Sequence, residues 1–324
     1  MTVLVIGGMG FIGRRVVRRL ADAGARVVCM DVNPGQASFP ENGEQIKFVA
    51  GDVTSFGDVV KAILEERPER IINLAYLLGE SDQKPHLAVR LNVLGMDNVF
   101  EAARLCGVKR VVFASSISYH GHSQTTHGDR LLTEEDPPAP GGVYGASKQF
   151  NEFMAGHYAR LYGTEIIAVR PCFVLGEGKP RGILEHLQVM TLPALGLPLR
   201  SPFKSSARFL VAHVEDIAEI FVRLTLAEKP QHSVYHTGGH PVTVGELASL
   251  VREVLPEAEI TFDDENGRDG RLVYLVDSSR LRDEFGIAHR PLRQLVLDII
   301  NGTRRMAGLP PVSRGPPAWR RAGP

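Results

Sequence analysis

The sequence predicts an α/β protein with a doubly wound parallel sheet, followed by a smaller C-terminal α/β lobe. Three observations carry this prediction. A glycine-rich turn joins an apolar strand to a helix at the N-terminus, Val- and Ile-rich strands then alternate with helical patterns, and this regularity breaks after Pro171. Strands that are apolar on both faces are typical of parallel sheets covered by helices on both sides.

The elements of the first half follow in order along the chain. The expected strands are Val3–Ile6, Arg26–Asp31, Ile46–Ala50, Arg70–Leu74 and Arg110–Ser115, and the intervening helices are Phe11–Ala23, Phe56–Arg67 and His86–Cys106. A further helix over Tyr144–Tyr162 leads into a strand over Glu165–Arg170. Alternation of this kind gives right-handed crossovers and a single sheet.

The second half is less regular. Glycines and prolines cluster at 176–182 and 193–202, which predicts loops that shape a pocket. The remaining expected elements are helices at 213–228, 243–255 and 291–306, short strands near 233–236 and 258–262, and an extended or disordered tail from Pro310. We therefore expect one domain over 1–172, with a returning segment near 211–240, and a second lobe with the tail over 173–324.

Composition excludes several classes of protein. The 324 residues carry 37 basic and 37 acidic side chains, so no basic footprint indicates a nucleic-acid partner. No apolar run approaches the roughly 20 residues of a membrane span. The three cysteines, Cys29, Cys106 and Cys172, are too few for a disulfide framework, and we expect a reducing cytoplasm.

The N-terminal turn has the spacing of a dinucleotide-binding loop. Gly7, Gly10 and Gly13 permit a sharp turn, close approach of a pyrophosphate and packing of the helix on the strand. Phe11 and Ile12 open the helix, whose N-terminus favours phosphate. We expect these five residues to bind the cofactor.

An acidic residue follows at the distance such loops require. Asp31 closes the second expected strand, where a carboxylate accepts hydrogen bonds from the adenosine ribose and repels a 2′-phosphate, so NAD is expected. Arg14 and Arg15 keep an NADP alternative open. Asp52, with Val53 beside it, is a weaker candidate for the adenine amino group.

A second constellation carries acid–base chemistry. Tyr144 and Lys148 are four residues apart on one face of the expected helix. A neighbouring ammonium, together with a cationic nicotinamide, would lower the pKa of the phenol from about 10 toward neutrality. Ser116 ends the strand that faces the expected crevice, where it could bind the same substrate oxygen as Tyr144.

Together these motifs resemble the extended branch of the short-chain dehydrogenase/reductases, specifically the NAD-dependent epimerase/dehydratase family, built on a Rossmann sheet. The matching segments are GGMGFIG at 7–13, Asp31, Gly51-Asp52-Val53, Asn73-Leu74-Ala75, Asn92, the serine motif at 113–116, YGASK at 144–148, Arg170-Pro171 and HVEDIA at 213–218, with weaker similarity to about residue 306. The resemblance therefore covers nearly the whole chain.

This resemblance implies roles for individual residues. Tyr144 would be the general acid/base, Ser116 would orient the reacting oxygen, and Lys148 would hold the nicotinamide ribose and depress the tyrosine pKa. Leu74, Ala75, Asn92 and Pro171 are then also expected at the cofactor. The segments matching 85–106 and 144–162 form a helical homodimer interface in such proteins, and the family's usual setting is carbohydrate metabolism.

The chain departs from the family pattern where the substrate binds. Ile117-Ser118 replaces the Asp-Glu pair of the dehydratases. Phe173 stands where sugar-nucleotide epimerases usually carry an asparagine for the diphosphate, and Phe209 where they carry an arginine. Arg208, one residue off register, and Arg268 could supply the missing cation. Substrate contacts are expected from Ser116, Ile117, Ser118, Phe173, Arg208 and Arg268, within the stretches 76–86, 117–127 and 172–210 and at 268.

Three functions remain open at this point. The first is an NAD-dependent oxidoreductase acting on a secondary alcohol or ketone of a small polar, sugar-like substrate, such as a free sugar, sugar acid or hydroxy acid. The second is a nucleotide-sugar 4-epimerase that reduces NAD transiently, and the third is a non-catalytic dinucleotide sensor. A metal site at His120, His122 and His127 is disfavoured because their spacing matches no tetrahedral ligand set.

Overall fold

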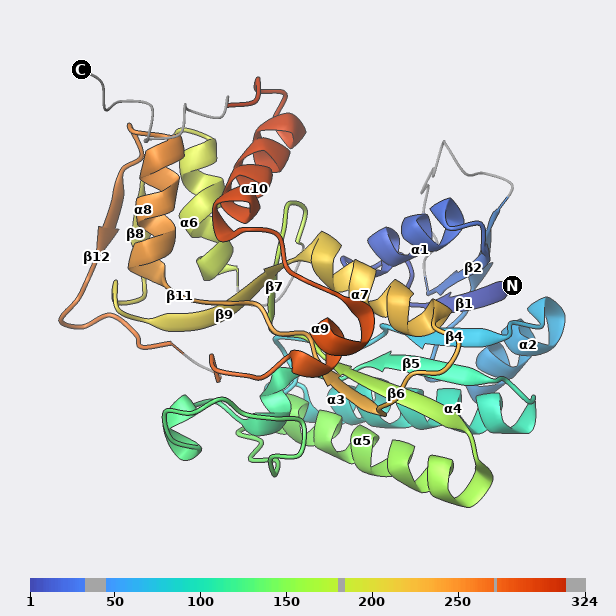
Figure 1. Cartoon of the computed structure of the whole chain (residues 1–324). Coiled ribbons are helices and arrows are strands. Elements are labelled where there is room, and N and C mark those ends of the chain that lie inside the picture. The colour runs from blue at the N-terminus through green and yellow to red at the C-terminus, as the bar shows by residue number, and fades with distance from the viewer. Residues whose placement is uncertain (33–44, 180–183, 271–272, 313–324) are drawn as a thin grey trace.

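The computed structural model describes residues 1–32, 45–179, 184–270 and 273–312. A seven-stranded sheet forms its centre (Figure 1). In chain order its strands are β1 (Thr2–Ile6), β2 (Arg26–Asp31), β3 (Ile46–Ala50), β4 (Arg70–Asn73), β5 (Arg110–Ala114), β6 (Glu165–Arg170) and β10 (Val234–His236). In space they follow the order β10-β6-β5-β4-β1-β2-β3, and every pairing is parallel.

This strand order indicates which edge of the sheet binds a ligand. The chain reverses its winding between β1 and β4, which pair side by side with Ile6 opposite Asn73. In doubly wound sheets, ligands bind at the carboxyl ends of the strands at such a switch point. The glycine turn after β1 and the loop after β4 therefore meet at the edge where a cofactor is expected.

Alternation along each strand sends side chains into two separate cores. Val3 and Val5 pack on one face of the sheet, and Leu4 and Ile6 on the other. Helices α1 (Gly13–Asp22) and α7 (Val214–Leu226) cover the first face. The second face is covered by α2 (Phe56–Glu66), α4 (Gly95–Leu105) and α5 (Val143–Tyr162). The two helical layers lie above and below the sheet in Figure 1.

The helix expected over His86–Cys106 is not uniform. It runs as α3 (Pro85–Ala88), a π-helical turn over Val89–Leu94 and then α4. The π-helical turn contains the buried Asn92, and such turns are frequent at functional sites.

The second lobe has its own core. Its strands are β7 (Phe173–Leu175), β9 (Arg208–His213) and β11 (His240–Thr243) in one sheet, and β8 (Leu199–Ser201) with β12 (Ile260–Phe262) in another. Its helices are α6 (Glu185–Ala194), α8 (Val244–Val254) and α10 (Leu292–Met306), while α9 (Ser279–Phe285) lies beside β10. Strand β9 lies between the two cores, since Phe209 and Val211 face the lobe and Leu210 and Ala212 face α7.

Most expected elements are confirmed, and the errors fall in the second half. The stretch 193–202 contains the end of α6 and all of β8, so the expectation of a plain loop there is wrong. Helices α6 and α9 and strands β7, β9 and β11 were not expected. Most of the tail from Pro310 lies outside the described residues, and the division near residue 172 stays a prediction.

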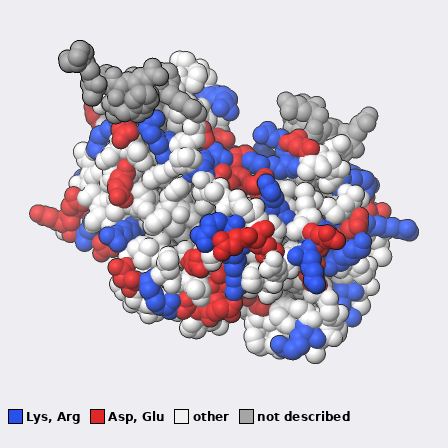
Figure 2. All heavy atoms as spheres, viewed as in Figure 1, with Lys and Arg blue, Asp and Glu red and all other residues white. Residues whose placement is uncertain are grey.

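The surface and thiols agree with an ordinary globular protein. Figure 2 shows Lys and Arg interspersed with Asp and Glu over the face in view. Among the described residues, no helix is long and apolar enough to cross a membrane. Cys29, Cys106 and Cys172 are free thiols. The expected reducing compartment stays a prediction.

Candidate active site

The glycine turn after β1 is shaped by close backbone contacts. Gly7 has a φ of +76°, and a Cβ on it would lie 2.8 Å from the Ala75 nitrogen. A Cβ on Gly13 would lie 2.2 Å from the Gly7 carbonyl oxygen. The Gly10 N–H donates to that same oxygen at 3.0 Å. No larger residue fits at Gly7 or Gly13 without moving the backbone.

A groove runs over this turn. Its lining comes from the glycine turn, the start of α1 and the loop after β4: Gly7, Gly10, Phe11, Ile12, Gly13, Leu74, Tyr76, Leu77 and Leu78, together with Lys179. The first N–H groups of α1 open onto it, as required for an anion. The groove therefore fits the pyrophosphate of a dinucleotide.

The acids expected near adenosine hold loops in place. The Asp31 carboxylate accepts the Met9 N–H at 3.1 Å, which ties the end of β2 to the glycine turn. Asp52 accepts the Thr54 N–H at 2.8 Å, and Val53 packs in the core. Contacts of Asp31, Asp52 and Val53 with a cofactor stay predictions.

Arg14 and Arg15 differ in their freedom to bind a 2′-phosphate. Arg15 forms ion pairs with Glu177 and Glu215, each at 3.3 Å, so its charge is already neutralised by protein carboxylates. Arg14 is more exposed and donates to the Met9 carbonyl at 2.9 Å. The NADP alternative therefore rests on Arg14 alone.

Of the residues that follow β4 and are expected at the cofactor, some lie at the groove and one does not. Leu74 lines the groove, and the backbone of Ala75 contacts Gly7. Asn92 is buried and accepts the Leu77 N–H at 2.7 Å while donating to the Leu77 carbonyl at 3.1 Å. Asn92 is thus placed to fix the loop that lines the groove, and the described structure gives it no place among the lining residues.

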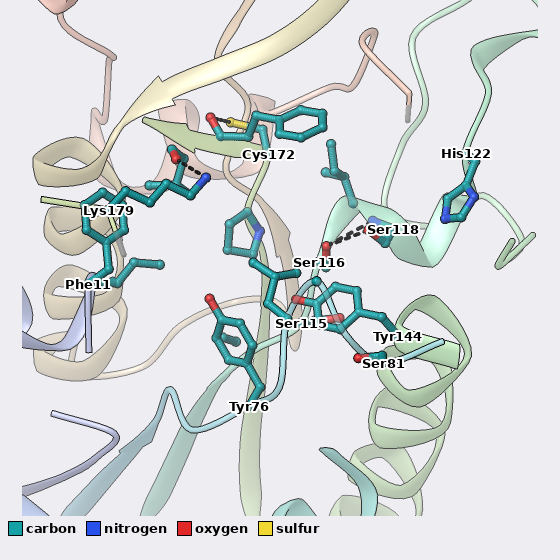
Figure 3. A pocket seen from close by; sticks show the side chains of 18 of the residues that line it. Phe11, Tyr76, Ser81, Ser115, Ser116, Ser118, His122, Tyr144, Cys172 and Lys179 are labelled. Atoms are coloured by element: carbon teal, nitrogen blue, oxygen red, sulfur yellow. Dashed lines mark hydrogen bonds between the residues drawn. The ribbon is translucent and has the colours of Figure 1, made fainter. Parts of the chain in front are cut away.

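A second cavity continues from the groove toward β5 and α5. Phe11, Ile12, Tyr76, Leu78 and Lys179 line both spaces. The second cavity is further lined by Gly79, Ser81, Asp82, Gln83, Ala114, Ser115, Ser116, Ile117, Ser118, His122, Tyr144, Pro171, Cys172, Phe173 and Val174. Figure 3 shows Phe11 and Lys179 on one side of it, with Ser118 and His122 on the other. We call this space the catalytic cavity.

Two of the three expected catalytic residues, Ser116 and Tyr144, line this cavity, and the third, Lys148, is buried behind the Tyr144 ring. Ser116 follows β5, and its hydroxyl lies near enough to the Tyr144 phenol of α5 to lower the pKa of that phenol. Lys148, one turn further along α5, donates from Nζ to the Ala114 carbonyl at 2.6 Å. Its ammonium lies 5.3 Å from the Tyr144 ring centroid and 4.7 Å from that of Tyr76. The sequence spacing therefore does bring serine, tyrosine and lysine together.

The expected lowering of the Tyr144 pKa is not found in the protein chain by itself. Burial raises the pKa of Tyr144 well above its usual value, and the neighbouring Tyr76 phenol raises it further, while Ser116 lowers it. Burial also lowers the pKa of Lys148 to about 7, so this amine carries only part of a charge at neutral pH. The positive charge of a bound cofactor beside Tyr144 would lower the pKa of the phenol.

A buried network of side chains fixes the loop after β5, which we call the serine loop because it carries Ser115 and Ser116. The Ser115 hydroxyl donates to Glu152, which receives two hydrogen bonds from Arg170, at 2.9 and 2.6 Å. Arg170 in turn donates to His236 at 3.3 Å. The loop after β5 is therefore anchored to α5, β6 and β10.

Two histidines complete this network in a defined protonation state. His236 Nδ1 lies 3.1 Å from the Asp277 carbonyl oxygen, which can only accept, so Nδ1 carries the proton. His236 Nε2 is therefore an acceptor, and it lies 2.9 Å from His120 Nε2, with Arg170 Nη1 3.3 Å from the first and 3.1 Å from the second. Burial next to Arg170 lowers the pKa of His120 to about 3 and that of His236 in the same direction. Both rings are neutral.

Four of the six residues expected at the substrate line the catalytic cavity, Ser116 among them, and their contacts with a substrate stay predictions. Ile117, Ser118 and Phe173 line the catalytic cavity, as does Pro171. Arg208 instead stacks over Tyr274, with 5.5 Å between guanidinium and ring centroid. Arg268 pairs with Glu185 at 3.1 Å. Neither arginine belongs to the cavity lining of the described chain.

An aromatic cluster surrounds Phe173 and Phe209. Phe173 and Phe209 meet edge to face, with ring centroids 5.4 Å apart, and His186 and Phe203 pack against them. Phe209 is buried on the side of β9 opposite to Arg208, because successive strand residues face opposite sides. The register of β9 thus excludes the possibility that Arg208 replaces Phe209 at the site.

Sequence reasoning did not single out several of the lining residues. Tyr76 covers Lys148, Asp82 accepts the Val143 N–H at the start of α5 at 2.8 Å, and Cys172 and Lys179 line the opposite side. Their stretches were expected to supply contacts, but nothing in the spacing of these residues marks them individually.

The three loop histidines have separate partners. His120 belongs to the buried network, His127 contacts the His120 carbonyl oxygen at 2.6 Å, and His122 lines the cavity. Over the described ranges, no group of three or more His, Cys, Asp or Glu residues could hold a metal ion.

Comparisons with known proteins agree with this geometry. The profile of the NAD dependent epimerase/dehydratase family matches residues 3–238. A UDP-glucose 4-epimerase from Mycolicibacterium smegmatis is 34% identical over 69% of this chain and 72% of its own length. The chain spans little more than half the length of some other curated relatives, 56% of one and 52% of another.

Solved structures share the fold over nearly the whole chain. The UDP-glucose 4-epimerase of Thermus thermophilus in complex with NAD superimposes with a TM-score of 0.81 at 26% identity, covering 94% of this chain and 99% of that one. A GalE-like L-threonine dehydrogenase from Cupriavidus necator gives a TM-score of 0.79 at 22% identity over 93% and 99%, and shows the fold alone. The motifs, the groove and these matches together show that the chain belongs to the NAD-dependent epimerase/dehydratase family, whose members are enzymes that use NAD.

Proposed function

We propose that this protein is a net NAD-dependent oxidoreductase, acting on a secondary alcohol or ketone of a small polar, sugar-like substrate. The observation that carries this proposal is the lining of the catalytic cavity. It combines Ser116 and Tyr144 with an aromatic wall at Phe173, and within the described chain it has no arginine for a diphosphate. Charge-assisted hydrogen bonds to phosphate are worth about 1.5–3 kcal/mol each, so their loss weighs against a sugar nucleotide.

The side chains divide the chemistry between them. Bound NAD supplies the hydride acceptor. Ser116 holds the substrate hydroxyl, and Tyr144 takes the proton from that oxygen as the carbon–hydrogen bond breaks. Lys148 is positioned on the Ala114 carbonyl, from which its ammonium favours the phenolate form of Tyr144. The products are a ketone, NADH and one proton.

The proposal is tested by incubating the purified protein with NAD and a panel of free sugars, polyols, hydroxy acids and nucleotide sugars. Absorbance of NADH is followed throughout. We expect steady NADH formation with a free polar alcohol, and its loss in Tyr144→Phe. Conversion of a nucleotide sugar into its 4-epimer, with no net NADH from any substrate, would reject the proposal.

A nucleotide-sugar 4-epimerase is the second candidate, favoured by the 34% identity to an enzyme with that name. It would use the same serine, tyrosine and lysine within one turnover. NAD that copurifies with the protein, together with stabilisation by uridine diphosphate in a melting assay, would support it. The non-catalytic alternative is supported only if Tyr144→Phe leaves every cellular function of the protein intact.

We also propose a homodimer formed by the helices over 85–106 and 144–162. Apolar side chains are exposed along these helices: Leu87, Val89, Leu94, Phe150, Phe153 and Leu161. Exposed apolar residues grouped on one face are typical of an interface. Light scattering after size exclusion should give twice the chain mass, and Phe153→Glu should give the monomer. A monomeric parent protein would contradict this proposal.

A further inference from the structure

Lys179 places a half-buried cation where the groove and the catalytic cavity meet. It lies in the loop after β7 and lines both spaces. Its Nζ donates to the Val174 carbonyl at 3.0 Å. Figure 3 shows its side chain beside Phe11, on the opposite side of the cavity from Ser118 and His122. The mechanism described above does not use this amine.

No carboxylate of the described residues forms an ion pair with Lys179. Glu177, two residues earlier, is taken up by Arg15 at 3.3 Å. The neighbouring Cys172 thiol is neutral, because burial raises its pKa to about 12. Partial burial of this ammonium without a counter-ion is unfavourable and lowers the pKa of Lys179 to about 8, so an anion brought by a ligand would relieve this cost.

The charges around the catalytic cavity are arranged asymmetrically. Among the described lining residues, Lys179 is the one lysine or arginine. The one carboxylate among the described lining residues is that of Asp82, which lies in the loop after β4 and accepts the Val143 N–H at the start of α5. An anionic group in the cavity is therefore attracted to the Lys179 side and repelled from the Asp82 side.

The surroundings of Lys179 favour one small anion. Its neighbours in the lining are Cys172, Phe173 and Val174, which offer no further cationic donor. A diphosphate needs several charge-assisted donors, whereas a carboxylate is satisfied by one ammonium and a few neutral groups. We propose that Lys179 binds the carboxylate of the substrate, so that the enzyme oxidises a hydroxy acid. This inference rests on the proposed oxidoreductase function and narrows its substrate class.

The test uses the NAD-bound protein and matched pairs of probes. Each pair is a hydroxy acid and the polyol that has CH2OH in place of the carboxylate: glycerate with glycerol, threonate with threitol, gluconate with glucitol. We expect at least one acid to be oxidised about tenfold more efficiently than its polyol. In Lys179→Met, kcat/KM for that acid should fall about 10- to 100-fold, mainly through KM, as expected for one charge-assisted hydrogen bond.

Controls separate a substrate site from a structural or cofactor role. Lys179→Arg keeps the charge and should restore part of the loss, and Lys61→Met, at an exposed lysine of α2, should behave as the parent protein. The NAD dissociation constant should change less than twofold in Lys179→Met. A weaker NAD complex with an unchanged KM for the acid would assign Lys179 to the cofactor pyrophosphate and overturn the inference.

A binding measurement keeps the inference testable without turnover. In a Tyr144→Phe background with NAD, each acid should raise the melting temperature more than its polyol does, and Lys179→Met should abolish the difference. If polyols are oxidised as well as acids and Lys179→Met has no effect, the inference fails while the oxidoreductase function stands. If only nucleotide sugars react, the function fails, and the melting data alone decide whether Lys179 binds a carboxylate.

Discussion

Replacing His186 by phenylalanine should make the protein less sensitive to acid. His186 lies in the first turn of α6 with its ring 3.8 Å from that of Phe209 and 4.7 Å from that of Phe173, centroid to centroid. Among the described residues neither of its ring nitrogens has a hydrogen-bond partner, and 1% of the residue is exposed. Burial, with Lys179 and Arg268 nearby, lowers its pKa from its ordinary 6.5 to about 3.

The sign and size of the effect follow from this pKa. Between pH 6.5 and 3 the unfolded chain binds a proton at His186 that the folded protein does not, so stability falls as pH falls through 6.5. Between pH 7 and pH 5 the loss from this one residue is about 2 kcal/mol. The His120 ring contributes a similar loss, and Glu134, whose pKa burial raises, acts in the opposite direction.

The assay is urea unfolding, followed by circular dichroism at pH 7 and pH 5. Relative to the parent, His186→Phe should lose about 2 kcal/mol less free energy of unfolding between the two pH values. At pH 7 it should be at least as stable, because an unpaired polar ring is replaced by an apolar one. His186→Leu repeats the test without added volume, and His86→Gln, at an exposed histidine, is the control. Equal pH dependence in the parent and both His186 variants would refute the reasoning.

Three further predictions concern the site and its support. Tyr144→Phe should reduce kcat by about 10²- to 10⁴-fold with an unchanged circular dichroism spectrum, and a loss below tenfold in the NADH assay would contradict its role as acid/base. Gly13→Ala should weaken NAD binding in a calorimetric titration because its Cβ would lie 2.2 Å from the Gly7 carbonyl oxygen, whereas Gly57→Ala, with 3.9 Å to its nearest neighbour, should bind NAD as the parent does. Glu152→Gln should cost about 3–5 kcal/mol in urea unfolding because it leaves the buried Arg170 without its counter-ion, while Glu101→Gln, in a more exposed pair with Arg104, should shift the midpoint little.

The sequence was sufficient to predict the fold of the cofactor half because the patterns that specify this half are local. The turn at Gly7 needs a positive φ, and the parallel strands are apolar on both faces, so both features are visible in short stretches of residues. The pairing of Tyr144 with Lys148 depends on one helical turn, which the spacing gives directly.

The substrate-binding half was harder to predict from the sequence because its features depend on contacts between segments that are far apart in the chain. Strand β7 has only three residues, too few for a recognisable alternation, and α6 contains Pro193, which argues against a helix. Lys179 and Tyr76 become neighbours of the same cavity only after the loops behind β7 and β4 have folded onto the sheet. The position of Arg208 depended on the register of β9, which no local pattern fixes.

The last strand of the central sheet has a consequence for how the protein is made. Strand β10 pairs with β6 through Tyr235 opposite Val169, yet the ribosome synthesises the whole of β7, α6, β8, β9 and α7 between them. Until His236 has left the exit tunnel, the outer edge of β6 has no partner and Arg170 lacks one of its buried contacts. The serine loop therefore acquires its full support late in translation, and a nascent chain arrested before that point would carry the nucleotide groove without a finished catalytic centre.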